Sequence, residues 1–171
     1  MSTLWRPAYV AIGSNLESPR ERVLEAMERL AALGAAHALV RSHLYLSRPM
    51  GPQDQPDYVN AVAALRTALA PGAMLHHLRA IEHRLGRRRE RRERRNAPRV
   101  LDLDLLLFGR RRLASTRLTV PHPRMHERAF VLRPLLDIAP AVTIPGRGAA
   151  RLWLRRVRNQ RVARTRSAFW R

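Results

Sequence analysis

Two aspartates, Asp102 and Asp104, stand two positions apart in the apolar segment RVLDLDLLLFG, residues 99–109. Alternate side chains of a β-strand share a face, so both carboxylates would point the same way, with backbone positions roughly 6.6 Å apart. Neighbouring carboxylates repel each other and resist burial, and divalent cations remove that cost. The pair therefore predicts a site for Mg²⁺, which binds carboxylate oxygens, water and substrate phosphates. From the pair alone, a solvent-facing strand with ordinary polar residues is an equal alternative.

Arginines precede the aspartate pair along the chain. Arg99 begins the segment, and a cluster from Arg87 to Arg95 lies just before it. The planar guanidinium group can bind phosphate oxygens in pairs, so arginines beside metal-binding carboxylates favour a nucleoside triphosphate site. The chain has no lysine, which excludes a lysine-dependent phosphate loop. For most of these arginines a solvated charge run is the alternative.

The composition bounds the class of protein. The 171 residues carry 33 basic and 13 acidic side chains, a formal net charge of +20, which attracts polyanions. Use of arginine without lysine also fits a compositional habit of the host. The absence of cysteine excludes disulfides, zinc-thiolate sites and a thiol nucleophile. The apolar runs are too short to span a bilayer, and residues 1–7 lack a secretory hydrophobic core, so we expect a cytoplasmic location and no membrane partner.

The pattern of elements predicts how these residues are positioned. Strands are expected at residues 8–12, 38–46, 58–65 and 99–109, and a proline-rich loop separates the second from the third. A capping box at residues 18–21, with Pro19 at the first helical position, predicts a helix that ends near Gly34. Pro71 begins a second helix, whose apolar face carries Met74, Leu75, Leu78, Ile81 and Leu85. The order β-α-β-β-α-β predicts an α+β, ferredoxin-like fold, an antiparallel sheet with both helices on one face.

The remainder forms C-terminal additions to this fold. Residues 110–118 suggest a short excursion or hairpin, and residues 120–140 suggest a loop into a short helix stopped by Pro134. We expect a domain over residues 1–146 and a basic tail over residues 147–171, which has helical spacing and no acidic residue. The tail could contact RNA, membrane phosphate or a partner, but a solvated C-terminal helix is favoured.

Four motifs resemble one known family. They are AIGSNL (residues 11–16), GPQDQPDYVNA (51–61), APRVLDLDLLLFG (97–109) and LTVPHPRMHERAFVLRPL (118–135), and they are similar to the 6-hydroxymethyl-7,8-dihydropterin pyrophosphokinases of folate biosynthesis. The resemblance implies transfer of pyrophosphate from ATP, the co-substrate, to the pterin hydroxymethyl oxygen, with release of AMP. It also implies a ferredoxin-like fold and two Mg²⁺ ions held by Asp102 and Asp104.

The resemblance also implies a set of site residues. The pterin would be bound by Ser47, Met50, Tyr58, Asn60 and Phe130. ATP would be bound by Glu82, Arg87, Arg89, Arg99, Leu105, Arg117, Thr119, His122 and Arg128. The catalytic residues would be Arg87, Arg99, Asp102 and Asp104, and no side chain is needed as a covalent nucleophile. Tyr58 and Phe130 would sandwich the pterin ring, a contact worth about 0.5–1.5 kcal/mol beyond burial. Without the motifs, both aromatics would be taken as core residues.

Two histidines four positions apart, His122 and His126, could form a metal pair on one helix face. The prolines on either side of His122 argue against a shared helix. We expect His122 to hydrogen-bond a phosphate or ribose and His126 to face solvent.

Some positions depart from the family pattern. Asn96 stands where many members have a tryptophan, Arg48 replaces a proline, and Pro123 replaces a frequent aromatic residue. The loop before Arg99 is also about two residues longer than in the commoner pattern of the family it resembles. These departures predict changes in loop closure and at the rim of the site, and they leave the metal site unchanged.

Two other functions are compatible with parts of the sequence. A four-stranded sheet with a basic surface can bind RNA through adjacent aromatics, but the expected central strand offers aspartates there, so we do not expect a nucleic-acid partner. A metal-dependent transferase acting on another alcohol would share the metal site and differ in its pocket. We expect a monomer whose partners are its small-molecule substrates.

Overall fold

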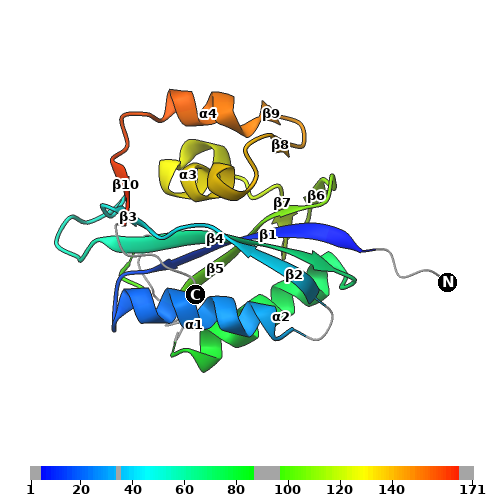
Figure 1. The fold of residues 1–171 in the computed structure, drawn as a ribbon, viewed down its shortest axis with the longest axis horizontal. Coiled ribbons are helices and arrows are strands. Elements are labelled where there is room, and N and C mark those ends of the chain that lie inside the picture. Colours follow the sequence, from blue (N-terminus) through cyan, green and yellow to red (C-terminus); the bar gives the residue numbers. More distant parts are fainter. Residues whose placement is uncertain (1–4, 34–35, 87–96, 166–171) are drawn as a thin grey trace.

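The fold is built on an antiparallel sheet, shown in Figure 1. The computed structural model describes residues 5–33, 36–86 and 97–165. The sheet has the order β10-β3-β4-β1-β5, and β2 also pairs with β4. Its strands are β1 (Arg6–Ser14), β2 (Ala36–Arg41), β3 (Tyr45–Ser47), β4 (Tyr58–Thr67), β5 (Asp102–Phe108) and β10 (Val162–Arg164).

Helices cover both faces of this sheet (Figure 1). On one face lie α1 (Pro19–Ala31) and α2 (Pro71–Arg84), as the ferredoxin-like prediction requires. On the other lie α3 (Ala129–Ile138) and α4 (Ala150–Arg156), which are the C-terminal additions. The remaining elements are the hairpins β6 (Leu113–Ala114) with β7 (Thr119–Val120) and β8 (Thr143–Ile144) with β9 (Gly148–Ala149), and the 3-10 turn η1 (Met125–Glu127). The predicted α+β fold is confirmed, and of the two forms expected for residues 110–118, an excursion or a hairpin, the structure shows the hairpin β6–β7.

The second predicted strand is divided into β2 and β3, which both pair with β4. Ser42 lies between them and is fully buried. Its backbone N–H donates to the Val62 carbonyl at 2.9 Å, and its hydroxyl accepts the Val62 N–H at 2.9 Å. Ser42 therefore keeps β4 hydrogen-bonded across the interruption.

The start of α1 differs from the prediction. The helix begins at Pro19 and buries Val23, Ala26, Met27 and Leu30, as the helical spacing requires. Ser18, however, has a left-handed backbone (φ 62°) and makes no side-chain cap. A capping hydroxyl needs an extended backbone to reach the first free N–H groups, so the predicted capping box is wrong. The helix also ends earlier than expected, at Ala31; Gly34 lies outside the described residues.

The prediction that Pro134 stops the short helix is wrong. Pro134 lies inside α3. Proline removes one backbone hydrogen bond from a helix interior. Here Pro134 is itself buried, and Leu132 and Leu135 on either side of it are fully buried. Burial of this apolar face offsets the missing hydrogen bond, so the helix continues to Ile138.

The register of β5 confirms the predicted faces of the aspartate strand. Leu103 and Leu105 are buried in the core shared with α1 and α2. Asp102 and Asp104 alternate with them and therefore face the opposite side of the sheet. Their register partners in β1 are Gly13 and Ala11. Both carboxylates thus lie on the side of the sheet that carries α3.

The described part of the tail packs against the domain. α4 contacts α3, and β10 pairs with β3. The tail prediction named only a helix, but residues 162–164 form a strand. A division of the chain near residue 146 stays a prediction.

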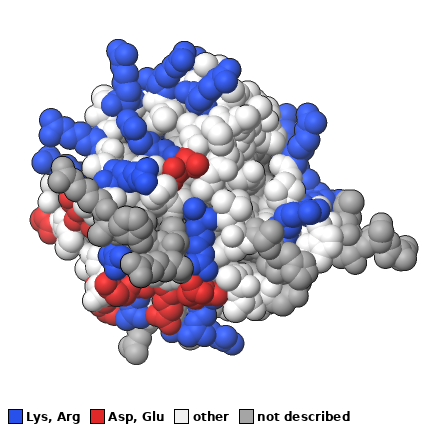
Figure 2. Space-filling view, viewed as in Figure 1, with Lys and Arg blue, Asp and Glu red and all other residues white. Residues whose placement is uncertain are grey.

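Charge is unevenly distributed on the surface. In Figure 2, arginines crowd the upper part of the face over α4, whereas acidic residues gather in the lower part near α1. Glu21, Glu25 and Glu28 belong to α1, and Arg151, Arg155 and Arg156 belong to α4. None of the helices within the described ranges is long and apolar enough to cross a membrane.

Candidate active site

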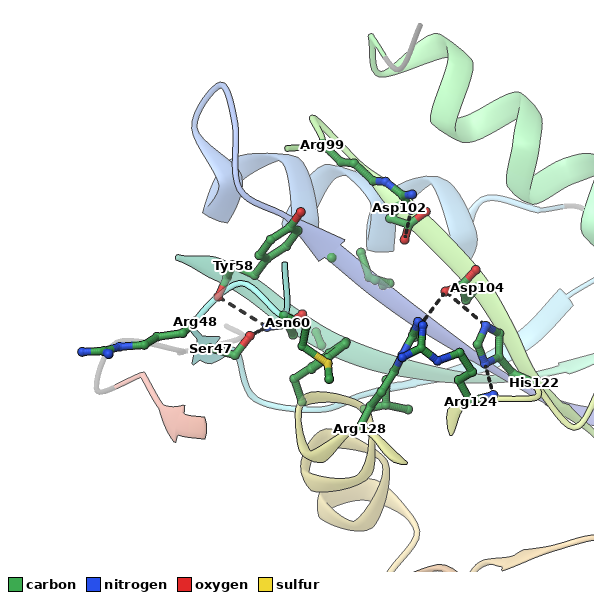
Figure 3. A pocket seen from close by; sticks show the side chains of 17 residues that line it. Ser47, Arg48, Tyr58, Asn60, Arg99, Asp102, Asp104, His122, Arg124 and Arg128 are labelled. Carbon is green, nitrogen blue, oxygen red and sulfur yellow. Dashed lines mark hydrogen bonds and ion pairs between the residues drawn. The ribbon is translucent and has the colours of Figure 1, made fainter. Parts of the chain in front are cut away.

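A pocket of about 280 Å³ lies between the sheet and the beginning of α3 (Figure 3). Its floor is formed partly by β1, where Ala11 and Gly13 leave space above the strand. These small residues are the register partners of Asp104 and Asp102, so the carboxylates stand beside the floor of the pocket. The full lining is Ala11, Ile12, Gly13, Ser47, Arg48, Met50, Tyr58, Asn60, Ala61, Arg99, Asp102, Asp104, His122, Arg124, Arg128, Phe130 and Val131.

Cationic and polar groups surround the aspartate pair. The Arg99 Nη1 donates to Asp102 Oδ2 at 2.7 Å. Asp104 Oδ2 lies 4.0 Å from Arg128 Nη1 and 3.7 Å from His122 Nε2. Burial, followed by the charge of Asp102, raises the pKa of Asp104 to about 7, and the charge of Arg128 reduces this effect only in part. Two carboxylates are therefore held together at an electrostatic cost.

His122 faces this pair as a neutral ring. Its Nδ1 accepts a hydrogen bond from the Arg124 backbone N–H at 3.2 Å, so the neutral ring carries its proton on Nε2, the atom nearest Asp104. Burial and the charge of Arg128 lower the pKa of His122 to about 4. The side chain is thus a hydrogen-bond donor that stays uncharged near neutral pH.

The donor set fits a hard divalent cation. Mg²⁺ is commonly held by one or two carboxylates, with water and substrate phosphates completing its shell. Asp102 and Asp104 provide such a pair, and the raised pKa of Asp104 is the sign of negative charge that a cation would relieve. The residues that the structure describes contain no group of three or more His, Cys, Asp or Glu suited to a metal.

The opposite end of the pocket is lined by Ser47, Met50, Tyr58, Asn60 and Phe130. Asn60 is buried, and its Nδ2 donates to the Ser47 hydroxyl at 2.9 Å. The Tyr58 hydroxyl donates to the Ala97 carbonyl at 3.2 Å. Two aromatic side chains and an oriented amide are suited to a flat heterocycle with a hydrogen-bonding edge.

The structure brings ten of the predicted site residues into this pocket. They are the five predicted pterin residues together with Arg99, Asp102, Asp104, His122 and Arg128. Arg87 and Arg89 lie outside the described residues, as does Asn96. The departures Arg48 and Pro123 differ in position: Arg48 lines the pocket and Pro123 does not.

Four predicted ATP residues lie elsewhere. Glu82 is buried behind β5, where its Oε1 accepts the Leu103 N–H at 2.8 Å. Leu105 directs its side chain into the core, which leaves its backbone to make any contact. Thr119 is exposed in β7, and Arg117 lines a second hollow between α2 and the β6–β7 hairpin. Their contacts with ATP stay predictions.

The prediction that His126 faces solvent is wrong. Its residue surface is 7% exposed, and its ring meets the Trp153 ring edge-on, with centroids 4.7 Å apart. Trp153 belongs to α4, in the tail that the sequence predicted as a helix either packed or solvated, so nothing near His126 in the sequence signalled this contact.

Asn15, which the sequence reasoning did not single out, supports the site from outside the lining of the pocket. Its side chain accepts the Arg99 N–H at 2.8 Å and donates to Gln55 Oε1 and the Pro56 carbonyl at 2.9 and 3.0 Å. It thereby ties together the segments that carry Arg99 and Tyr58. The signal was its place in the AIGSNL motif, outside any predicted element. Arg124, which lines the pocket and orients His122, was also missed.

Comparisons with known proteins identify relatives of this chain. A sequence profile of the 7,8-dihydro-6-hydroxymethylpterin-pyrophosphokinase (HPPK) family matches residues 9–140. The chain is 46% identical over 138 residues to a 2-amino-4-hydroxy-6-hydroxymethyldihydropteridine pyrophosphokinase from Haemophilus influenzae, covering 81% of this chain and 84% of that protein. It is 50% identical over 137 residues to the Pseudomonas aeruginosa protein of the same name, covering 80% and 83% respectively.

Solved structures show the same fold. A Plasmodium falciparum HPPK-DHPS protein, wild type with pteroate, superposes with a TM-score of 0.68 at 13% sequence identity. The match covers 90% of this chain and 42% of that longer chain, so this chain spans less than half of its length.

Proposed function

Because the chain belongs to the 7,8-dihydro-6-hydroxymethylpterin-pyrophosphokinase family, we propose that the pocket beneath α3 is its active site. The protein is a pyrophosphokinase of folate biosynthesis, which transfers pyrophosphate from ATP to 6-hydroxymethyl-7,8-dihydropterin and releases AMP. One observation carries the assignment of the site: the five pterin residues and the aspartate pair line one pocket.

Asp102 and Asp104 are the residues that would hold magnesium, and we expect two ions. When bound, Mg²⁺ would neutralise phosphate charge and lower the pKa of the attacking hydroxyl. The residues of the chain itself supply position and further charge. Arg99 lies against Asp102 at 2.7 Å and would stand at the edge of the metal site, beside the phosphates.

Arg128 and His122 would bind phosphate oxygens. The Arg128 Nε is buried and has no hydrogen-bond acceptor among the described residues, which leaves it for an anionic ligand. The neutral His122 would donate from Nε2 without adding a charge that competes with the cations. Both groups lie within 4.0 Å of Asp104, so they would contact the phosphates nearest the metal.

The pterin would lie between Tyr58 and Phe130, with Asn60 at its hydrogen-bonding edge. Asn60 is oriented before any ligand binds, because Ser47 accepts its Nδ2–H. A held amide loses little freedom on binding and discriminates ligands that lack the matching donor or acceptor. Met50, 47% exposed, would cover the open side of the ring.

The nucleoside part of ATP would extend towards the second hollow. Arg117 and Leu118 of the hairpin segment line it from one side, and Leu75 and Arg79 of α2 line it from the other. Apolar and cationic side chains of this kind are suited to a purine and its ribose. Arg87 and Arg89 would contribute further phosphate contacts. We also expect a monomeric, cytoplasmic enzyme with no nucleic-acid partner.

A product assay tests the proposed site. ATP, Mg²⁺ and the pterin are incubated with the wild type, Asp102→Asn, Asp104→Asn and the control Glu21→Gln, an exposed carboxylate on α1. We expect pterin-dependent AMP from the wild type and the control, and at least a hundredfold less from both aspartate variants. Full activity in either aspartate variant would refute the metal assignment. ADP in place of AMP, or AMP release that the pterin does not stimulate, would point to another acceptor alcohol.

A further inference from the structure

Gln160 connects the C-terminal segment to residues 127–129, the segment that carries Arg128. It lies between α4 and β10, outside the residues that the family profile matches. Its Nε2 donates to the Glu127 carbonyl at 2.8 Å, and its Oε1 accepts the Ala129 N–H at 2.8 Å. One side-chain amide thus bonds to the backbone on both sides of Arg128.

These hydrogen bonds complete the beginning of α3. Arg128 is the N-cap residue of this helix and makes no side-chain cap. The first N–H groups of a helix have no partner within the helix, and Gln160 supplies the acceptor for one of them. A second contact lies beside it, because the buried ring of His126 packs edge-on against Trp153 of α4. Residues 126–129 are therefore held from the side of the tail.

The same short segment presents two pocket residues. The Arg128 Nη1 lies 4.0 Å from Asp104 Oδ2, and the Arg128 guanidinium carbon lies 5.7 Å from the centre of the Phe130 ring. Figure 3 shows Arg128 extending from the beginning of α3 towards Asp104. The backbone at residues 127–129 sets where both side chains begin. A shift of this backbone would move the guanidinium away from the phosphates that we assign to it.

We propose that Gln160 is a positioning residue for the pyrophosphoryl transfer, which acts by holding the backbone around Arg128. The proposal rests on the phosphate-binding role proposed above for Arg128. It extends the active site to a part of the chain beyond the family match. Gln160 itself does not line the pocket, so it would act only through the residues that it holds.

Three variants isolate the two hydrogen bonds. Gln160→Met keeps the length of the side chain and removes both, and Gln160→Glu keeps the acceptor for the Ala129 N–H and loses the donor to the Glu127 carbonyl. Asn159→Ala changes the exposed neighbouring residue and is the control. We expect Gln160→Met to lower kcat/KM for MgATP about tenfold and Asn159→Ala to match the wild type. Gln160→Glu should lose at least as much as Gln160→Met, because its carboxylate oxygen would face the Glu127 carbonyl oxygen.

A double-mutant cycle with Arg128→Ala separates positioning from general stability. If Gln160 acts through Arg128, Gln160→Met should cause little further loss of kcat/KM in the Arg128→Ala background. If Gln160→Met has wild-type kinetics while Arg128→Ala is impaired, the positioning role of Gln160 is overturned and the role proposed for Arg128 is not. Losses that multiply in the double variant would overturn it as well, since a merely structural role predicts them. Wild-type kinetics for Arg128→Ala would instead overturn the role proposed for Arg128.

Discussion

Replacing Asp104 with asparagine should stabilise the metal-free protein near pH 8 while it abolishes catalysis. Burial and the neighbouring Asp102 raise the pKa of Asp104 from 3.8 to about 7, so its charge destabilises the folded protein. For a fully buried carboxylate this difference corresponds to about 4 kcal/mol. The Asp104 side chain is 35% exposed. Solvent screening reduces the effect, and we expect a gain of about 1–2 kcal/mol in the free energy of unfolding.

The pH dependence gives the sign of this effect. Between pH 4 and pH 7 the folded protein holds a proton on Asp104 that the unfolded chain has released. The destabilisation is therefore absent below pH 4, grows as the pH rises, and is complete above pH 7. The stabilisation in Asp104→Asn should follow the same course, largest at pH 8 and close to zero at pH 4.

Urea denaturation in EDTA at pH 8 and pH 5 measures this directly. Asp137→Asn is a control of opposite sign, because hydrogen bonds from His43 outweigh the effect of burial and lower the pKa of Asp137. That variant should lose stability at pH 8. Added Mg²⁺ should stabilise the wild type at pH 8 and leave Asp104→Asn unchanged. If Asp104→Asn is less stable than the wild type in EDTA at pH 8, the carboxylate pair is not held at a cost and the argument for a cation fails.

Three further predictions concern neighbouring residues. His122, whose pKa is lowered to about 4, should show no NMR titration between pH 8 and pH 5.5, and a titration midpoint near pH 6.5 would contradict this. Because the folded protein keeps this ring neutral, the free energy of unfolding should decrease as the pH falls from 6.5 towards 4. Glu82→Ala should cost about 1–3 kcal/mol in urea denaturation because it leaves the buried Leu103 N–H without its acceptor, whereas Glu82→Gln should recover part of the loss. Phe130→Leu keeps an apolar side chain and should raise KM for the pterin about three- to tenfold, with KM for ATP unchanged; an equal rise in both would argue against stacking.

The sequence predicted the aspartate strand well because its faces depend only on strand geometry. Alternation places Leu103 and Leu105 in the core and Asp102 and Asp104 on the other face, whatever the rest of the chain does. The helices α1 and α2 were predicted for a similar reason, since their apolar spacing and N-terminal prolines are local signals. The pocket residues were expected together only through the family motifs, because they come from separate elements.

Two of the predictions that failed depended on distant contacts. A proline commonly ends a helix when only the local sequence is considered. In α3, burial of the apolar face stabilises the helix beyond Pro134. His126 was expected in solvent because Trp153, which covers it, comes from another element. Ser18 matched a capping pattern, but its backbone conformation, which the pattern does not determine, prevents the cap. The hydrogen bonds of Gln160 were invisible for the same reason as the contact of His126.

The strand β10 also bears on self-association. A bare sheet edge offers free N–H and C=O groups to other chains, and proteins protect edges with short strands and charged residues. β10 occupies the edge beside β3, is only three residues long, ends with the exposed Arg164 and is preceded by the exposed Arg161. At the other edge, the Leu106 carbonyl of β5 accepts the His122 N–H at 2.9 Å. The arginine-rich tail therefore gives the sheet a short, charged border that discourages edge-to-edge aggregation.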